Sequence, residues 1–256
     1  MIKMLLTDLD HTLLRQDGSI SDETLKMISK ARAAGIKFAI ATARYWIGAE
    51  RYIDLLKPDY EITTDGTLIH SGDECIYSCE FDEDTTDLIV RCLLEAVPGS
   101  EITVAVGKCV YWNSKHIAES EKLYKAVYND YSSRLDVKAN KIVAELPDEK
   151  TAKDIADRTG CKLQSYRSEN WYAFMPKDSG KIEAIKALSK ISGIPLECIA
   201  AFGDDTNDIE MLKLCGKGIA VSNAVPEVLK IADEITSSND EDGVAGWIAE
   251  NCIMDQ

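Results

Sequence analysis

Residues 2–12 read IKMLLTDLDHT, a short apolar run that stops at two closely spaced aspartates. The run has no helical or alternating period, which is typical of a strand buried on both faces of a parallel sheet. The pattern recurs in residues 36–44, IKFAIATAR, and in residues 199–208, IAAFGDDTND. Because ligands bind outside the carboxyl ends of strands in open parallel sheets, these polar strand ends are the first candidate site.

Strands and helices alternate in both flanks of the chain. The flanking strands not yet named are expected at residues 60–64 and 218–221. Helices are predicted from capping residues and apolar spacing at residues 21–35, 47–56, 181–192, 208–214 and 225–232. This alternation predicts an α/β domain built on a parallel sheet.

The middle of the chain follows a different pattern. Residues 102–106 and 110–112 form a predicted hairpin around Gly107, and a helix is expected over residues 116–128. We therefore predict a Rossmann-like, doubly wound parallel sheet core formed by residues 1–80 and 178–256. An α+β cap domain is expected to be inserted at residues 81–177.

Composition narrows the classes of partner. The net charge of −15 over 256 residues argues against binding a nucleic-acid backbone or an anionic membrane through charge. No apolar run approaches membrane-spanning length, and no secretory signal is expected. The eight cysteines form no CxxC pair, which favours free thiols and a cytoplasmic location over structural zinc or disulfides. Composition does not predict the oligomeric state.

The aspartates at the strand ends suggest a metal site. If the strands pack side by side, Asp8, Asp10, Asp204 and Asp208 should gather near one point. Carboxylates that close repel one another unless a cation lies among them, and an oxygen-only donor set suits Mg²⁺. The alternative is that each aspartate merely caps a helix, which is common for a single Asp.

The sequence also resembles a known family. DLDHT at residues 8–12 is similar to the nucleophile motif of the haloacid-dehalogenase-like phosphatases, and GDDTND at residues 203–208 is similar to their fourth motif. Thr42 and Lys181 stand where the second and third motifs are expected. The tail at residues 218–245 resembles that of the Cof-like sugar-phosphatase branch, which carries a large α+β cap between the second and third motifs.

This resemblance implies a set of roles. Asp8 would attack phosphorus, and Asp10 would give a proton to the leaving group and later take one from water. The implied Mg²⁺ site consists of Asp8, the main-chain carbonyl of Asp10, and Asp204, with Asp208 in or near the outer shell. The implied phosphate contacts come from Thr42, Ala43, Lys181 and Asn207.

Several positions depart from the family pattern. His11 and Ala43 stand where the family usually has Gly, and Asp65 stands where it usually has Asn. None of these changes removes a catalytic group, so we expect activity to be kept and specificity to differ. The sequence leaves open whether Arg44 reaches the substrate or pairs with surface acids. Also open is whether three aromatics of the insert contact substrate or belong to its core: Trp112, Trp171 and Tyr172.

The predicted function is that of a Mg²⁺-dependent phosphatase for small phosphorylated metabolites, with sugar phosphates favoured. One alternative is a phosphomutase or phosphotransferase that uses the same aspartyl-phosphate. Another is an inactive protein that binds phosphorylated metabolites. A signalling receiver domain is disfavoured, because it would need neither the insert nor 256 residues.

Overall fold

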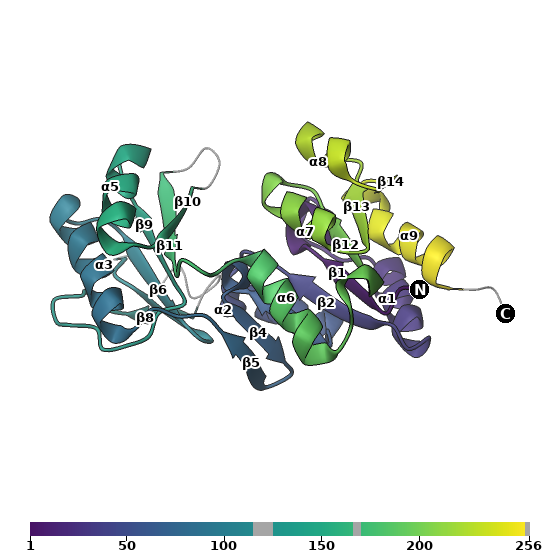
Figure 1. Cartoon of the computed structure of the whole chain (residues 1–256), viewed down its shortest axis with the longest axis horizontal. Coiled ribbons are helices and arrows are strands. Elements are labelled where there is room, and N and C mark those ends of the chain that lie inside the picture. The colour runs from purple at the N-terminus through teal and green to yellow at the C-terminus, as the bar shows by residue number, and fades with distance from the viewer. Residues whose placement is uncertain (115–124, 166–169, 254–256) are drawn as a thin grey trace.

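The computed structural model describes residues 1–114, 125–165 and 170–253, and these residues form two sheets (Figure 1). The larger sheet has eight strands in the order β14-β13-β12-β1-β2-β3-β4-β5. Neighbouring strands are parallel from β14 to β3, and β4 and β5 extend this sheet in antiparallel fashion. The strands are β1 Met4–Thr7, β2 Lys37–Ala41, β3 Tyr60–Thr63, β4 Leu68–Ser71, β5 Glu74–Ser78, β12 Ile199–Gly203, β13 Lys217–Val221 and β14 Glu234–Thr236.

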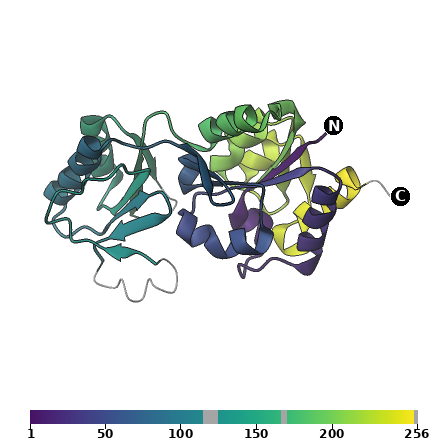
Figure 2. The ribbon, with the colours of Figure 1, turned by 90° about the horizontal axis from the view of Figure 1, so that it is seen from below.

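Helices cover both faces of this sheet. In Figure 2 the green helices α6 and α7 lie on one face, and the purple-blue helices α1 and α2 lie on the other. The first of them begins as the sequence predicts, because Ser21 Oγ accepts a hydrogen bond from the Thr24 backbone N–H at 3.0 Å. The core helices are α1 Asp22–Ala33, α2 Trp46–Leu56, α6 Lys181–Ser192, α7 Ile209–Leu214, α8 Pro226–Ile231 and α9 Gly243–Cys252.

The second sheet belongs to a separate layer with its own hydrophobic cluster. Its six strands have the order β10-β11-β9-β6-β7-β8. Helices α3 (Glu83–Ala96) and α5 (Glu149–Thr159) pack against each other and against this sheet. The strands are β6 Ile102–Val106, β7 Cys109–Trp112, β8 Val127–Tyr128, β9 Lys141–Glu145, β10 Lys162–Ser165 and β11 Trp171–Met175. Figure 1 shows this unit at one end of the molecule, with both chain termini at the other end.

Alternation along the strands gives the second sheet two different faces. Ile102, Val104 and Phe174 point into the buried cluster that α3 and α5 cover. The intervening residues, such as Thr103 and Val143, therefore lie on the opposite face. That face is turned toward the larger sheet, since Thr103 lines a cavity together with residues of that sheet's loops.

The doubly wound α/β core and the α+β insert agree with the sequence-based prediction. One element was wrong in part: residues 127–128 form the short strand β8, not the end of a helix. The remainder of that predicted helix, residues 116–124, lies outside the described residues. The hairpin of β4 and β5 was not predicted, because each of these strands is short and mixes polar with apolar residues.

Two further features bear on the classes of protein considered. None of the helices in the described ranges is both long and apolar enough to cross a bilayer. The eight cysteines all lie within those ranges, and each is a free thiol.

Candidate active site

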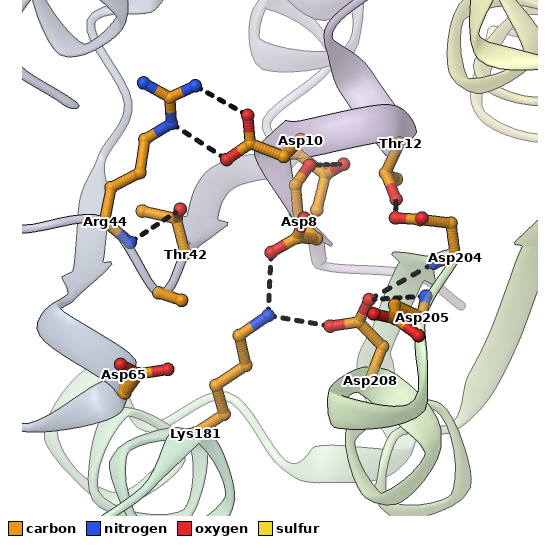
Figure 3. A network of polar contacts seen from close by, with 12 residues as sticks. Asp8, Asp10, Thr12, Thr42, Arg44, Asp65, Lys181, Asp204, Asp205 and Asp208 are labelled. Carbon is orange, nitrogen blue, oxygen red and sulfur yellow. Dashed lines mark hydrogen bonds and ion pairs between the residues drawn. The ribbon is translucent and has the colours of Figure 1, made fainter. Parts of the chain in front are cut away.

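The carboxyl ends of β1 and β12 bring three buried aspartates together (Figure 3). Thr7 of β1 pairs with Phe202 of β12, so Asp8 and Asp204 leave the sheet side by side. One carboxylate oxygen from each of Asp8, Asp204 and Asp208 lies within 4.8 Å of the others. The structure thus joins residues that are about 200 positions apart in sequence, as the parallel-sheet argument predicts.

Lys181 completes this cluster from the first turn of α6. Its Nζ donates hydrogen bonds to Asp8 Oδ1 and to Asp208 Oδ1, each at 2.7 Å. Burial opposes the positive charge of Lys181, but the carboxylates of Asp208 and Asp8 outweigh that penalty and raise its pKa. The ammonium is therefore held charged beside Asp8.

The position of Lys181 depends on a close backbone contact. Gly66 has a φ of +84°, and a Cβ there would lie 2.4 Å from the backbone nitrogen of Lys181. Only glycine allows the turn after β3 to approach the start of α6 so closely. The Asp65-Gly66 turn thereby fixes where the Lys181 side chain begins.

Asp208 stabilises the cluster through hydrogen bonds to both of its carboxylate oxygens. Its Oδ2 accepts hydrogen bonds from the backbone N–H groups of Asp204 and Asp205, at 3.2 and 3.3 Å. With Oδ1 bound to Lys181, both oxygens already have donors. Asp208 folds beneath Gly203, where an added Cβ would lie 2.5 Å from the Asp208 Cβ. Its contacts suit an outer-shell residue better than a direct metal ligand.

The remaining two carboxylates fit a divalent cation. Burial raises the pKa of Asp8 well above its usual value, although Lys181 lowers it. The negative charges of Asp208 and Asp204 raise this pKa further. Burial also raises the pKa of Asp204 to about 6, although Thr12 Oγ1 donates to its Oδ1 at 2.6 Å. A cation between Asp8 and Asp204 would relieve this repulsion, and oxygen donors suit a hard ion.

Asp10 lies apart from the three clustered carboxylates. It sits in an irregular helical turn, Leu9–Leu13, and its carboxylate accepts two hydrogen bonds from Arg44, at 2.6 and 2.8 Å. The structure therefore gathers three aspartates where the sequence suggested four, and it places Arg44 against a site residue and not against a surface acid. His11 follows in the left-handed region at φ 58°, a conformation that glycine adopts more readily than histidine.

The other predicted phosphate contacts surround this cluster. Thr42 is buried, and its Oγ1 accepts from the Arg44 backbone N–H at 3.2 Å. The carbonyl of Ala43 accepts from Lys141 Nζ of the second sheet at 3.2 Å. Asn207 lies exposed in the turn Thr206–Asp208 and lines a cavity together with Lys181.

Contacts between the two sheets include a buried ion pair that the sequence analysis missed. Lys141 pairs with Asp65, and their side chains are only 4% and 5% exposed. Gln164 Nε2 donates to the same carboxylate at 3.3 Å, and Tyr45 Oη and Thr103 Oγ1 are 2.7 Å apart. The sequence feature that could have predicted this pair is Asp65 itself, which stands where the resembled family usually has Asn. A buried carboxylate at that position needs a partner.

A cavity of about 380 Å³ lies between the two sheets. Arg44, which binds the Asp10 carboxylate, and Ala43 form part of its wall on the core side. The second sheet contributes the opposite wall, including Thr103 and Trp171.

Comparisons with known proteins agree with this architecture. The family model for haloacid dehalogenase-like hydrolases matches residues 5–248. The 5-amino-6-(5-phospho-D-ribitylamino)uracil phosphatase of Bacillus subtilis is 27% identical, with 96% of each chain covered. The HMP-PP phosphatase of Enterobacter sp. is 26% identical, with 90% of this chain and 87% of that protein covered.

Solved structures show the same fold. A haloacid dehalogenase-like hydrolase from Bacteroides thetaiotaomicron superposes with a TM-score of 0.82 at 24% identity, covering 98% of this chain and 99% of that one. The family model spans nearly the whole chain, including Asp8, Lys181 and Asp204. The chain therefore belongs to the haloacid dehalogenase-like hydrolase family.

Proposed function

We propose that this protein is a Mg²⁺-dependent phosphatase that hydrolyses small phosphorylated metabolites through an aspartyl-phosphate on Asp8. The observation that best supports this proposal is that Lys181 Nζ lies 2.7 Å from Asp8 Oδ1, inside a cluster of three buried aspartates. Such a cluster concentrates what phosphoryl transfer needs, namely a nucleophile and positive charge for the phosphoryl oxygens. The phosphatase names of the relatives support the same reaction class.

Asp8 is assigned as the nucleophile that forms the new bond to phosphorus. Lys181 holds its carboxylate and offsets negative charge as the phosphoryl group approaches. Mg²⁺ bound by Asp8 and Asp204, with the Asp10 carbonyl as a further ligand and Asp208 bracing from outside, would neutralise charge on the phosphoryl oxygens. The proposed phosphate contacts are Thr42, Ala43, Lys181 and Asn207.

Asp10 is assigned as the general acid and base. Its carboxylate lies beyond the strand end, held by Arg44 through two hydrogen bonds. In the first step Asp10, protonated and released from Arg44 on one oxygen, gives its proton to the oxygen of the departing alcohol, whose bond to phosphorus breaks as Asp8 takes the phosphoryl group. In the second step it takes a proton from the water that attacks phosphorus and frees Asp8.

We further propose that residues 1–80 and 178–256 act as the catalytic core and that residues 81–177 act as a cap. Each of the two sheets has its own hydrophobic cluster, which supports this division. The cap contributes closure and selection of substrate, because every residue assigned to the chemistry lies on the core. Sugar phosphates are the substrates that the family resemblance suggests, and the cytoplasmic location stays a prediction of the sequence.

Phosphate release from p-nitrophenyl phosphate and a panel of phosphorylated metabolites tests this function. We expect release with Mg²⁺ and none with EDTA. Recovery of a new phosphate ester in place of free phosphate would indicate the phosphotransferase or phosphomutase alternative. Binding of phosphorylated metabolites without turnover of any of them would indicate an inactive binding protein.

A further inference from the structure

The cavity between core and cap has mostly apolar and aromatic walls. Its volume of about 380 Å³ lies within the usual range for small-molecule sites. Arg44 and Lys141 are the charged residues among its described lining. The aromatic and aliphatic members include Tyr45, Val110, Trp112, Val143 and Trp171.

Strand register places the cap residues of this wall on one face. Thr103 of β6 pairs with Trp112 on one side and with Val143 on the other. Residues paired across neighbouring strands share a face, so Trp112 and Val143 flank Thr103 on the side turned to the core. The neighbouring Tyr172 lies in the cap's own core instead.

Most polar groups on the cavity wall already form hydrogen bonds or ion pairs with other groups of the protein. The hydroxyls of Tyr45 and Thr103 lie 2.7 Å apart and bond to each other. Arg44 binds Asp10, and Lys141 binds Asp65 and the carbonyl of Ala43. A buried sugar hydroxyl would find few partners here, and burying polar groups without partners is costly.

Three aromatic side chains line this cavity, namely Tyr45 of the core and Trp112 and Trp171 of the cap. The indole nitrogen of Trp112 has almost no accessible surface, so a ligand in the cavity would contact the carbon surface of this ring. Apolar walls of this kind are suited to a planar ring, which aromatic side chains bind by stacking.

The cavity also lies on the correct side of the catalytic cluster. Arg44 lines it and contacts Asp10, the residue assigned to protonate the leaving group. A second cavity, of about 660 Å³, opens on the Lys181 side and has mainly charged and polar walls that include Lys162 and Lys177. The apolar cavity therefore fits the alcohol part of the substrate better than the second cavity does.

We propose that the alcohol part of the substrate carries a planar unsaturated ring, which binds between Trp112 and Trp171 of the cap and Tyr45 of the core. This inference rests on the proposed phosphatase function. It narrows the substrate from phosphorylated metabolites in general to phosphate esters with a flat ring, whether the ring is attached directly or through a sugar. Bare sugar phosphates, which the family resemblance suggests, would then be poorer substrates than esters that carry a ring.

Two matched pairs of esters test the proposal. Uridine 5′-monophosphate and ribose 5-phosphate differ by the ring, as do benzyl phosphate and ethyl phosphate. We expect kcat/KM to be about tenfold or more higher for the ring-bearing member of each pair, which is the range of one aromatic stacking contact. Equal values, or a preference for the member without a ring, would overturn the proposal.

Variants of the two cap tryptophans test which residues cause the preference for ring-bearing esters. Trp171→Ala and Trp112→Leu should each lower kcat/KM for the ring-bearing ester by about tenfold more than for ethyl phosphate, and the melting temperature of each variant reports correct folding. Tyr128→Ala is the matched control, because Tyr128 is an exposed aromatic of the same sheet that does not line the cavity. An equal loss for both esters in the tryptophan variants would contradict the assignment.

Binding separates this proposal from the proposed function. Calorimetry with the Asp8→Asn variant and Mg²⁺ measures the affinity for each ester without turnover. If the wild type hydrolyses none of the esters, nor p-nitrophenyl phosphate, the phosphatase assignment fails. A ring preference in binding would still support the cavity assignment, and equal affinities would overturn it.

Discussion

The core and the cap differ in the chemistry of their side chains on either side of the interface. In the core, ionised groups bind one another across strand ends, as Lys181 does with Asp8 and Asp208. On the cap side, aromatic and aliphatic residues such as Trp112 and Val143 predominate. We therefore expect reactivity to depend on the core and selectivity on the cap.

The largest effect is expected from Asp8→Asn. Asn keeps the shape of the side chain but is a poor nucleophile and removes a negative charge from the metal site. Turnover should fall by about 10⁴-fold or more, as for other covalent nucleophiles, with the melting temperature retained. Asp73→Asn is the control, since it removes the same charge at a fully exposed position. Activity of a tenth of the wild type in Asp8→Asn would refute the nucleophile assignment.

Asp10→Asn should have the next largest effect. Loss of general acid–base help typically slows a reaction by about 10²–10⁴-fold. The loss should be smaller for p-nitrophenyl phosphate than for ethyl phosphate, because nitrophenolate leaves without a proton. Rapid-quench measurement of phosphoenzyme formation isolates this step. An equal loss for both leaving groups in that step would mean that Asp10 is not the acid.

The ion pair between Lys141 and Asp65 tests whether the cap and core are coupled. Lys141→Met leaves Asp65 buried without its main cation, which typically costs about 3–5 kcal/mol. Opening of the cap would hydrate Asp65, so we expect the cost to appear as faster hydrogen exchange around residues 43–45 and 141–145. Adding Asp65→Asn should restore much of the protection. Unchanged exchange in Lys141→Met would show that this pair does not hold the cap.

The smallest effect is expected from the pH dependence of Mg²⁺ binding. Burial raises the pKa of Asp204 to about 6, above the value of 3.8 for an ordinary Asp. Because the folded state binds this proton more tightly than the unfolded state, protonated Asp204 stabilises the fold fully below about pH 3.8. This contribution disappears as the pH rises through about 6. Mg²⁺ needs the ionised carboxylate, so the metal should stabilise the protein more at pH 7.5 than at pH 5.

Thermal unfolding measures this linkage. At a Mg²⁺ concentration of about 100 Kd, the metal should add about 2.7 kcal/mol to the free energy of unfolding. About half of this increment should be lost at pH 5, where a pKa of about 6 weakens Mg²⁺ binding roughly tenfold, and most of it should be lost in Asp204→Asn at either pH. A Mg²⁺ effect of full size in Asp204→Asn would show that Asp204 is not a ligand.

The sequence predicted more of the core than of the cap. The strand ends at Asp8 and Asp204 were predictable, because an apolar run followed by acids reports both burial and position in a parallel sheet. The bond between Arg44 and Asp10 was not, since a charge pair between two loops leaves no periodic signal. The strand at Val127–Tyr128 was also missed, because two exposed residues pair with β7 only through tertiary context.

The cap face shows the same limit. Trp112 and Trp171 could be named as candidates, but their direction depends on the register of β7 and β11 within the sheet. One residue of register shift would have turned them into the cap's own core. The Asp65 departure was visible in the sequence, whereas its partner Lys141 is an ordinary strand residue until the two sheets are brought together.

In the proposed mechanism, Asp8 carries the phosphoryl group during turnover. Acid quenching within the first turnover, followed by proteolysis and mass spectrometry, detects a phosphoryl group on an aspartate directly. We predict a phosphorylated peptide that contains Asp8, formed before free phosphate and absent in Asp8→Asn. Release of phosphate with no covalent intermediate, or with the group on another residue, would contradict the account.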